Sequence, residues 1–175
     1  MFKRLLKVLK TCFSLNEVGT VGQHIRYGQI KGKQVNIGGL AWAASQAVKN
    51  QSGKFVWVND GALTLNDADA NPIFGWAQEY ERTPTVGDKV TVNVAWDAVY
   101  RIPIASGTFV VGMIGDSCDM DRTTHTTHGA NTQGALLDAS DEDLLLIVGG
   151  DVDNNKYVDV RINPYPADAV IGTID

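Results

Sequence analysis

Apolar and polar residues alternate along much of the chain between Gly53 and Ile162. The alternation is clearest between Gly87 and Trp96, where one set of positions holds Val90, Val92, Val94 and Trp96 and the intervening set holds Lys89, Thr91 and Asn93. Successive side chains of a β-strand point to opposite faces, so this pattern predicts a strand with one buried and one solvated face. We therefore expect Trp96, like the tryptophans at positions 42, 57 and 76, to pack in a core rather than to form a carbohydrate platform.

Short turn sequences separate the alternating segments. Asn59-Asp60-Gly61 joins the strands expected at 55–58 and 62–65, because glycine reaches the positive φ that a tight hairpin requires. Further strands are expected over 73–77, 89–96, 100–104, 108–114, 144–148 and 157–162. Glycine occupies 18 of 175 positions, which suits a fold with many turns. We predict an all-β fold, a small antiparallel β-sandwich or barrel, with a β-domain over residues 53–163.

The first 13 residues follow a different period. Five apolar side chains form one stripe at helical spacing: Phe2, Leu5, Leu6, Leu9 and Phe13. Lys3, Lys7 and Lys10 form a separate basic face. The pattern predicts an N-terminal amphipathic helix and then an extended arm over residues 1–52, while residues 164–175 are expected to form a C-terminal tail. Within the arm, residues 25–28 and 33–37 are candidate short strands, and residues 40–48 are a short helix or an extended segment. Because so short a helix is marginally stable alone, we expect it to dock on its own body, a neighbouring copy, another protein or a lipid surface.

Charge is divided unevenly along the chain. The formal net charge is −5, but residues 1–12 carry four basic side chains and no acid, and the remainder carries 11 basic and 20 acidic side chains. A body at −9 argues against general nucleic-acid binding. No apolar run approaches the ~20 residues of a transmembrane helix, and Lys7 and Lys10 interrupt the only candidate signal-peptide core. We expect no nucleic-acid partner and no membrane-spanning helix, and a membrane surface is a less favoured partner than a protein.

The two cysteines, Cys12 and Cys118, are too few for a disulfide framework. We expect both to be free thiols, in a protein that matures in a reducing cytosol. Stability must then come from packing or from assembly.

One short motif suggests a nucleophile. Gly115-Asp-Ser-Cys resembles the start of a G-D-S-L hydrolase block, in which Ser117 would attack the substrate. Such chemistry needs an α/β frame and a general base held close to the hydroxyl, and the surrounding pattern is all-β. We therefore interpret the motif as a turn after a strand and predict that the protein is not an enzyme.

Metal-ligating residue types crowd into one segment. Cys118, Asp119, Asp121, His125 and His128 lie within eleven residues, and all five can bind a transition metal. Their spacing matches no standard zinc site, so the residues are weak candidates and the segment 115–134 is interpreted as a polar loop. No cofactor is expected.

A second acidic segment partly matches a calcium-binding loop. Asp151, Asp153 and Asp159 occupy its first, third and ninth positions. Lys156 and Ile162 stand where that loop needs glycine and glutamate, so a plain hairpin turn is the favoured interpretation.

The order of the strand and turn sequences resembles the small β-domains of tailed-bacteriophage capsid decoration (cement) proteins. The resemblance covers residues 53–162 and is carried by Gly-Lys-Phe-Val-Trp-Val, Asn-Asp-Gly-Ala-Leu-Thr-Leu, Pro-Ile-Phe-Gly-Trp-Ala, Val-Gly-Asp-Lys-Val-Thr-Val-Asn-Val, Tyr-Arg-Ile-Pro-Ile and Ala-Ser-Gly-Thr-Phe-Val-Val-Gly. The basic N-terminal helix, the glycine-rich segment 14–52 and the histidine-containing loop depart from the compact pattern of that family.

The resemblance implies a structural virion protein that lies on the outer capsid surface, commonly as a homotrimer, and bridges subunits of the major capsid protein. In this chain the expected capsid contacts are the residues of the N-terminal stripe and its basic face: Phe2, Lys3, Leu5, Leu6, Lys7, Leu9, Lys10 and Phe13. The loop 115–134 is a second candidate contact. Two alternatives stay open: a host-attachment or glycan-binding fibre head, which predicts exposed aromatic side chains in a groove, and a peripheral membrane protein anchored by residues 1–13.

Overall fold

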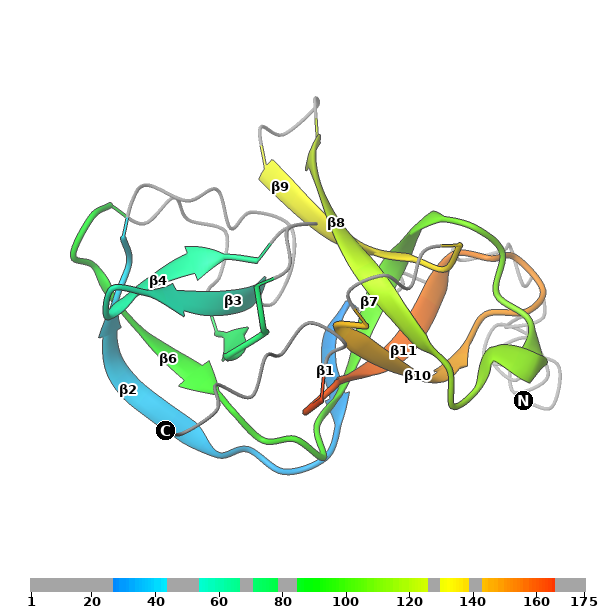
Figure 1. Cartoon of the computed structure of the whole chain (residues 1–175), viewed down its shortest axis with the longest axis horizontal. Helices are drawn as coiled ribbons and strands as arrows, with labels where there is room; N and C mark the ends of the chain where they lie inside the picture. The colour runs from blue at the N-terminus through cyan, green and yellow to red at the C-terminus, as the bar shows by residue number, and fades with distance from the viewer. Residues whose placement is uncertain are drawn as a thin grey trace, which may run out of the picture.

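A computed structural model describes residues 27–43, 54–66, 71–78, 85–125, 130–138 and 143–165, without the side chains of residues 122–132. The described residues form eleven strands and a single 3-10 turn, arranged as two adjoining sheets (Figure 1). The predicted all-β class is therefore confirmed. The helix predicted over residues 2–13 lies outside the described residues.

One sheet has five strands and curls into a small barrel. Its strands are, in spatial order, β2 (Asn36–Ala41), β6 (Lys89–Asn93), β5 (Gly75–Ala77), β3 (Lys54–Asn59) and β4 (Ala62–Leu65). Every neighbouring pair is antiparallel. The two end strands meet where Trp42 bridges Leu63, and the Ala43 N–H donates to the Leu63 carbonyl at 2.9 Å. This contact joins the ends of the sheet around a core of alternating apolar residues.

The second sheet has six strands. Their spatial order is β1 (Gly28–Lys31), β7 (Val99–Ser106), β11 (Tyr157–Ile162), β10 (Leu145–Gly150), β8 (Ser117–His125) and β9 (Ala130–Leu136). A parallel pairing between β7 and β9 also links the far end of the sheet back to its second strand. The β8–β9 hairpin projects beyond the rest of the sheet (Figure 1).

The stretch predicted to be an extended arm contributes a strand to each sheet. β1 pairs with β7, and β2 pairs with β6. Gly32, between them, has φ +92°, and a Cβ there would collide with the Asp97 carbonyl oxygen, so only glycine fits this close approach. Residues 28–41 therefore belong to the β-body, whose start at residue 53 was predicted too late.

The predicted burial of Trp96 is wrong. Strand β6 ends at Asn93, because the Asn93 carboxamide oxygen accepts hydrogen bonds from the Val35 N–H at 2.9 Å and the Ala95 N–H at 3.0 Å. The chain turns there, so the alternation no longer determines the direction of Trp96, whose side chain is 62% exposed. Of the other tryptophans, Trp42 and Trp76 are buried as predicted, whereas Trp57 is partly exposed and lies outside both apolar cores, so its predicted core position is wrong.

An aromatic cluster joins the two sheets. Phe55 of β3, Trp76 of β5 and Tyr100 of β7 are all buried, with ring centroids 4.8 to 5.1 Å apart. They lie in the larger of two apolar cores, which is otherwise formed by the six-stranded sheet and its loops. The barrel has its own smaller core. The sheets are therefore packed against each other through side chains of large buried area.

A buried glutamine adds a polar link between the sheets. Gln133 of β9 accepts a hydrogen bond from the Phe55 N–H at 2.7 Å. Its Nε2 donates to the carbonyl oxygens of Phe55 at 2.8 Å and Asn66 at 2.9 Å. Each of these three residues is buried, so the hydrogen bonds satisfy backbone groups that water does not reach.

Lys54, the first residue of β3, is fully buried. Burial lowers the pKa of its amine to about 7, because transfer out of water disfavours the charged form. Between this value and the ordinary lysine pKa of 10.5, the unfolded chain holds more protons than the folded chain. The free energy of unfolding must therefore rise with pH across that window.

Replacing Lys54 by methionine should remove this pH dependence. We expect the free energy of unfolding of the unmodified protein to rise, from about pH 6 to about pH 9, by ~2 kcal/mol more than that of the Lys54→Met variant. Urea denaturation at several pH values measures both. Lys89→Met, at the exposed first position of β6, is the matched control and should keep the dependence. Parallel curves for the original protein and Lys54→Met would contradict a depressed pKa.

Candidate functional site

Three large aliphatic side chains are exposed at one end of the six-stranded sheet. They are Val110, Val111 and Ile114, which are 50%, 63% and 52% exposed; we refer to them as the apolar tip. Val111 begins the 3-10 turn η1 (Val111–Met113), and Val110 and Ile114 lie on either side of it. A strand was predicted over 108–114, which is wrong: β7 ends at Ser106, and Gly107 turns the chain with φ +83°.

The loop that carries the apolar tip is held in place by its backbone. The Met113 N–H donates to the Val110 carbonyl at 2.9 Å, and the Gly115 N–H donates to the Ile147 carbonyl of β10 at 2.9 Å. Phe109 anchors the loop in the core, and its N–H donates to the Asn155 side-chain oxygen at 2.8 Å. The loop is therefore ordered without covering its aliphatic side chains, which lowers the entropy cost of binding a partner there.

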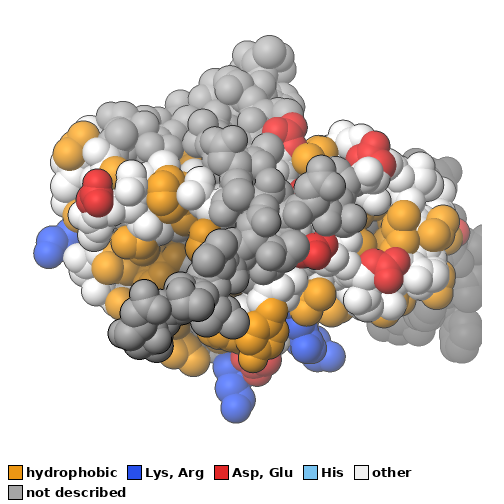
Figure 2. Space-filling model, in the orientation of Figure 1, with side chains coloured by type: hydrophobic (Ala, Val, Ile, Leu, Met, Phe, Trp, Pro, Cys, Tyr) orange, Lys and Arg blue, Asp and Glu red, His pale blue; other side chains and the backbone are white. Residues whose placement is uncertain are grey.

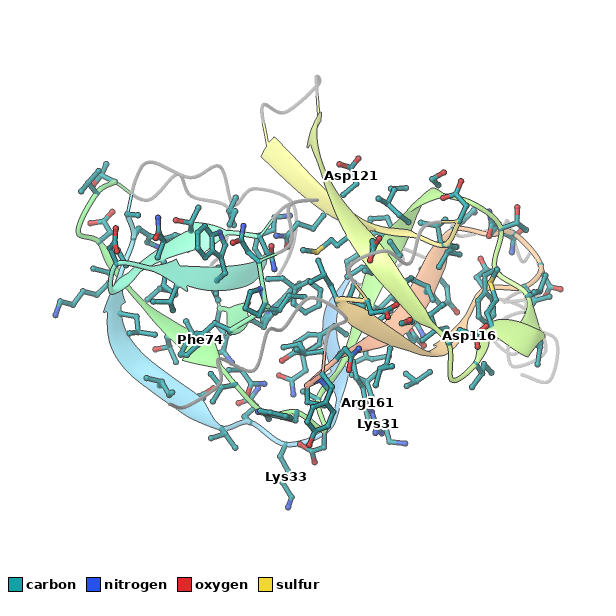
Figure 3. The ribbon with its side chains drawn as sticks, in the orientation of Figure 1. Lys31, Lys33, Phe74, Asp116, Asp121 and Arg161 are labelled. Carbon is teal, nitrogen blue, oxygen red and sulfur yellow. The ribbon has the colours of Figure 1, made fainter. Side chains whose placement is uncertain are left out.

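A polar pocket of about 550 Å³ lies beside the tip, and Asp116, Ser117 and Asp138 line it together with Asn163. Asp116 lies at the end of the sheet that carries η1 (Figure 3). The Ser117 hydroxyl donates to the Asp143 carboxylate. His125 is eight residues along the same strand, or ~26 Å away. Among the described residues, the Ser117 hydroxyl therefore has a carboxylate as its partner and no imidazole.

The structure describes the side chains of three of the proposed metal ligands, Cys118, Asp119 and Asp121. Cys118 faces the core, where burial and, next, the negative charges of Asp119 and Asp143 raise the pKa of its thiol to about 12. The Asp119 carboxylate accepts a hydrogen bond from the Asp143 N–H at 2.9 Å. Asp121 is partly exposed further along β8; His128 and the His125 side chain lie outside the description. In the described part of the chain, no three metal-ligating side chains gather.

The segment interpreted as a polar loop, 115–134, is instead mostly the β8–β9 hairpin, with register pairs from Asp119–Leu136 to His125–Ala130. Its signal in the sequence is the run of threonines, which favour strands because they are β-branched. The acidic segment that begins at Asp151 is the turn between β10 and β11, as predicted, and Asn155 takes a positive φ of 52° there.

An apolar groove of about 300 Å³ lies where the two sheets meet. Its lining comes from both: Ile37, Pro72, Ile73, Phe74, Val94, Trp96, Ile162, Asn163 and Pro164. Trp96, Ile37 and Phe74 are 62%, 40% and 37% exposed. Figure 3 labels Phe74, which comes from the chain just before β5, and Figure 2 shows apolar side chains gathered over the five-stranded sheet. Sequence alternation missed this groove because it placed Trp96 inside.

The groove offers little for a polar ligand. Among the described residues that line it, none is charged, and the polar groups are the Asn163 carboxamide and the indole N–H of Trp96. The Asn163 Nδ2 donates to the Asp143 carbonyl at 2.7 Å, and its Oδ1 accepts from the Tyr165 N–H at 3.0 Å. The carboxamide is therefore already engaged, and sugar hydroxyls would find few partners among the lining side chains.

The predicted contact residues of the N-terminal stripe and basic face, from Phe2 to Phe13, lie outside the described residues. Comparison of the chain with family models, curated proteins and solved structures finds no match. Over the described ranges, no helix is both long and apolar enough to cross a membrane. The apolar tip and the apolar groove are therefore the candidate binding surfaces of the described residues.

Proposed function

We propose that this chain is a structural, non-enzymatic virion protein that decorates the outer surface of a viral capsid. In this role it would bridge subunits of the major capsid protein as a homotrimer. The observation that carries the proposal is the apolar tip: three aliphatic side chains exposed on a loop that is already ordered. The resemblance of residues 53–162 to decoration-protein domains supports the same role.

The chemistry of the tip favours a protein partner. Burying an aliphatic side chain contributes ~1.5–3 kcal/mol relative to full exposure, so three half-exposed side chains supply a useful but weak contact. Symmetric copies on a capsid multiply such contacts. Asp116 and Asp153 are exposed beside the tip and in the neighbouring β10–β11 turn, so an anionic membrane surface is a poorer partner. The N-terminal stripe, from Phe2 to Phe13, would add a second contact.

A host-attachment or glycan-binding role is the second candidate, because it predicts exposed aromatic side chains in a groove. Trp96 and Phe74 meet that description. The Asn163 carboxamide is engaged and none of the described lining residues is charged, which weighs against a sugar ligand. Capsid binding is therefore favoured.

Substitution at the apolar tip tests the proposal. We expect Val111→Asp to weaken binding to capsids that lack this chain by ~10-fold or more, because the buried contact would hold an uncompensated carboxylate. Co-sedimentation of purified protein with those capsids measures the affinity. Val86→Asp is the matched control, since Val86 is an equally exposed valine, 69% accessible, before β6 of the barrel. Equal losses for both variants, or for neither, would contradict a contact through the tip.

A further inference from the structure

We propose that the apolar groove is the intramolecular binding site of the chain's own segment 166–175, which would cover Trp96. The segment follows directly on the end of β11, where the last residue of the strand and the two after it line the groove: Ile162, Asn163 and Pro164. The Asn163 N–H donates to the Leu144 carbonyl at 3.0 Å. The described chain therefore reaches Tyr165 at the rim of the groove, with its path fixed by hydrogen bonds.

The segment is long enough and apolar enough to fill the groove. Ten residues in extended conformation span up to ~33 Å, which exceeds the width of a cavity of this volume. Val170, Ile171 and Ile174 supply large apolar side chains of the kind that an uncharged groove accepts. By contrast, the segment that precedes the Pro72 side of the groove, residues 67–70, reads Asp-Ala-Asp-Ala and has no large apolar side chain.

Charge favours the same occupant. The segment carries two acids, Asp168 and Asp175, and no base. Lys31, Lys33 and Arg161 are exposed and project along one edge of the molecule (Figure 3). Arg161 directly precedes the groove residue Ile162, so an acidic segment that leaves the end of β11 begins close to this basic edge.

Tethering favours the segment over a separate molecule. A free peptide or a second copy loses translational and rotational freedom on binding, whereas a segment attached at the rim is present at a high effective concentration. The prolines at positions 164 and 166 restrict the backbone at the exit and reduce the freedom that docking would remove. Occupation by the segment would leave the apolar tip as the surface available to a partner.

The indole N–H signal of Trp96 in a nitrogen-15 correlation spectrum reports whether the groove is filled. Trp96→Phe identifies that signal among the four tryptophans. We expect deletion of residues 166–175 to shift it and to increase acrylamide quenching of Trp96 fluorescence about twofold, and a synthetic peptide of residues 166–175 to restore the signal. Ile171→Asp in the full chain should give the same shift. It also keeps the test valid if the shortened chain does not fold.

Val152→Asp, an exposed aliphatic position in the β10–β11 turn, is the control and should leave the Trp96 signal unchanged. An identical Trp96 signal in the full and shortened chains would overturn the proposal. So would a signal in the full chain that changes on dilution, because that result indicates a segment supplied by a second copy. Capsid binding by the Val111→Asp variant is a separate readout, so failure here is distinguishable from failure of the proposed function.

Discussion

Replacing Gln133 by leucine is expected to lower the free energy of unfolding by ~3–5 kcal/mol, because two buried backbone groups each lose a hydrogen bond to its side chain. The Phe55 N–H and the Asn66 carbonyl oxygen both bond to the Gln133 side chain. The Phe55 carbonyl oxygen keeps a partner, since the Asn66 N–H also donates to it at 3.0 Å. Leucine fills a similar volume, so the loss reports the hydrogen bonds and not a cavity.

Urea denaturation followed by tryptophan fluorescence measures the change in stability. Gln34→Leu is the matched control, because Gln34 is exposed and, among the described residues, its side chain makes one hydrogen bond, of 3.4 Å, to Gln29. The control should change the free energy of unfolding by less than ~0.5 kcal/mol. A loss below ~1 kcal/mol for Gln133→Leu would mean that water or a rearranged side chain satisfies the two backbone groups, and that Gln133 does not join the sheets.

Trp76→Ala should destabilise the protein by a comparable ~3–5 kcal/mol, since it removes the ring at the centre of the junction between the sheets. Trp76 stacks on Tyr100 at 4.9 Å and meets Phe55 edge-on at 4.8 Å. A cavity at this position separates a barrel residue from a residue of the six-stranded sheet. Gln133 and the rest of the larger core still connect the two sheets. Both sheets should therefore unfold in one transition, but at a lower denaturant concentration.

Two other substitutions sharpen this experiment. Trp57→Ala removes the same side chain from β3 at a partly exposed position outside both apolar cores, and should cost less than ~2 kcal/mol. Tyr100→Phe keeps the ring but removes a buried hydroxyl that has no hydrogen-bond partner among the described residues, so stability should hold or rise by ~1 kcal/mol. Equal losses for Trp76→Ala and Trp57→Ala would contradict a special role for the aromatic cluster.

The local pattern was sufficient for the fold class, and for the β3–β4 and β10–β11 hairpins, because alternation and turn residues are properties of neighbouring positions. It failed where a distant partner decides the outcome. Asn93 ends β6 through the Val35 N–H, 58 residues away, and this contact leaves Trp96 outside the core. Nothing near Trp96 in the sequence reports that bond.

The burial of Gln133 and the exposure of the apolar tip also could not be predicted from alternation. Gln133 shows no apolar pattern, since its burial depends on backbone groups of Phe55 and Asn66 in the other sheet. The apolar tip breaks alternation, with Val110 and Val111 adjacent and both exposed. Two adjacent valines between glycines fit a strand by propensity, but the positive φ at Gly107 and the hydrogen bonds of η1 override it. The residues proposed for binding are therefore those that departed from the pattern.

Electron cryomicroscopy of viral particles purified from cultures that produce this chain tests the proposed capsid role most directly. The account predicts density for the two-sheet body on the outer capsid surface, with Val110, Val111 and Ile114 packed against major capsid protein subunits. Particles without such density, or with the body present and the apolar tip directed into solvent, would contradict it.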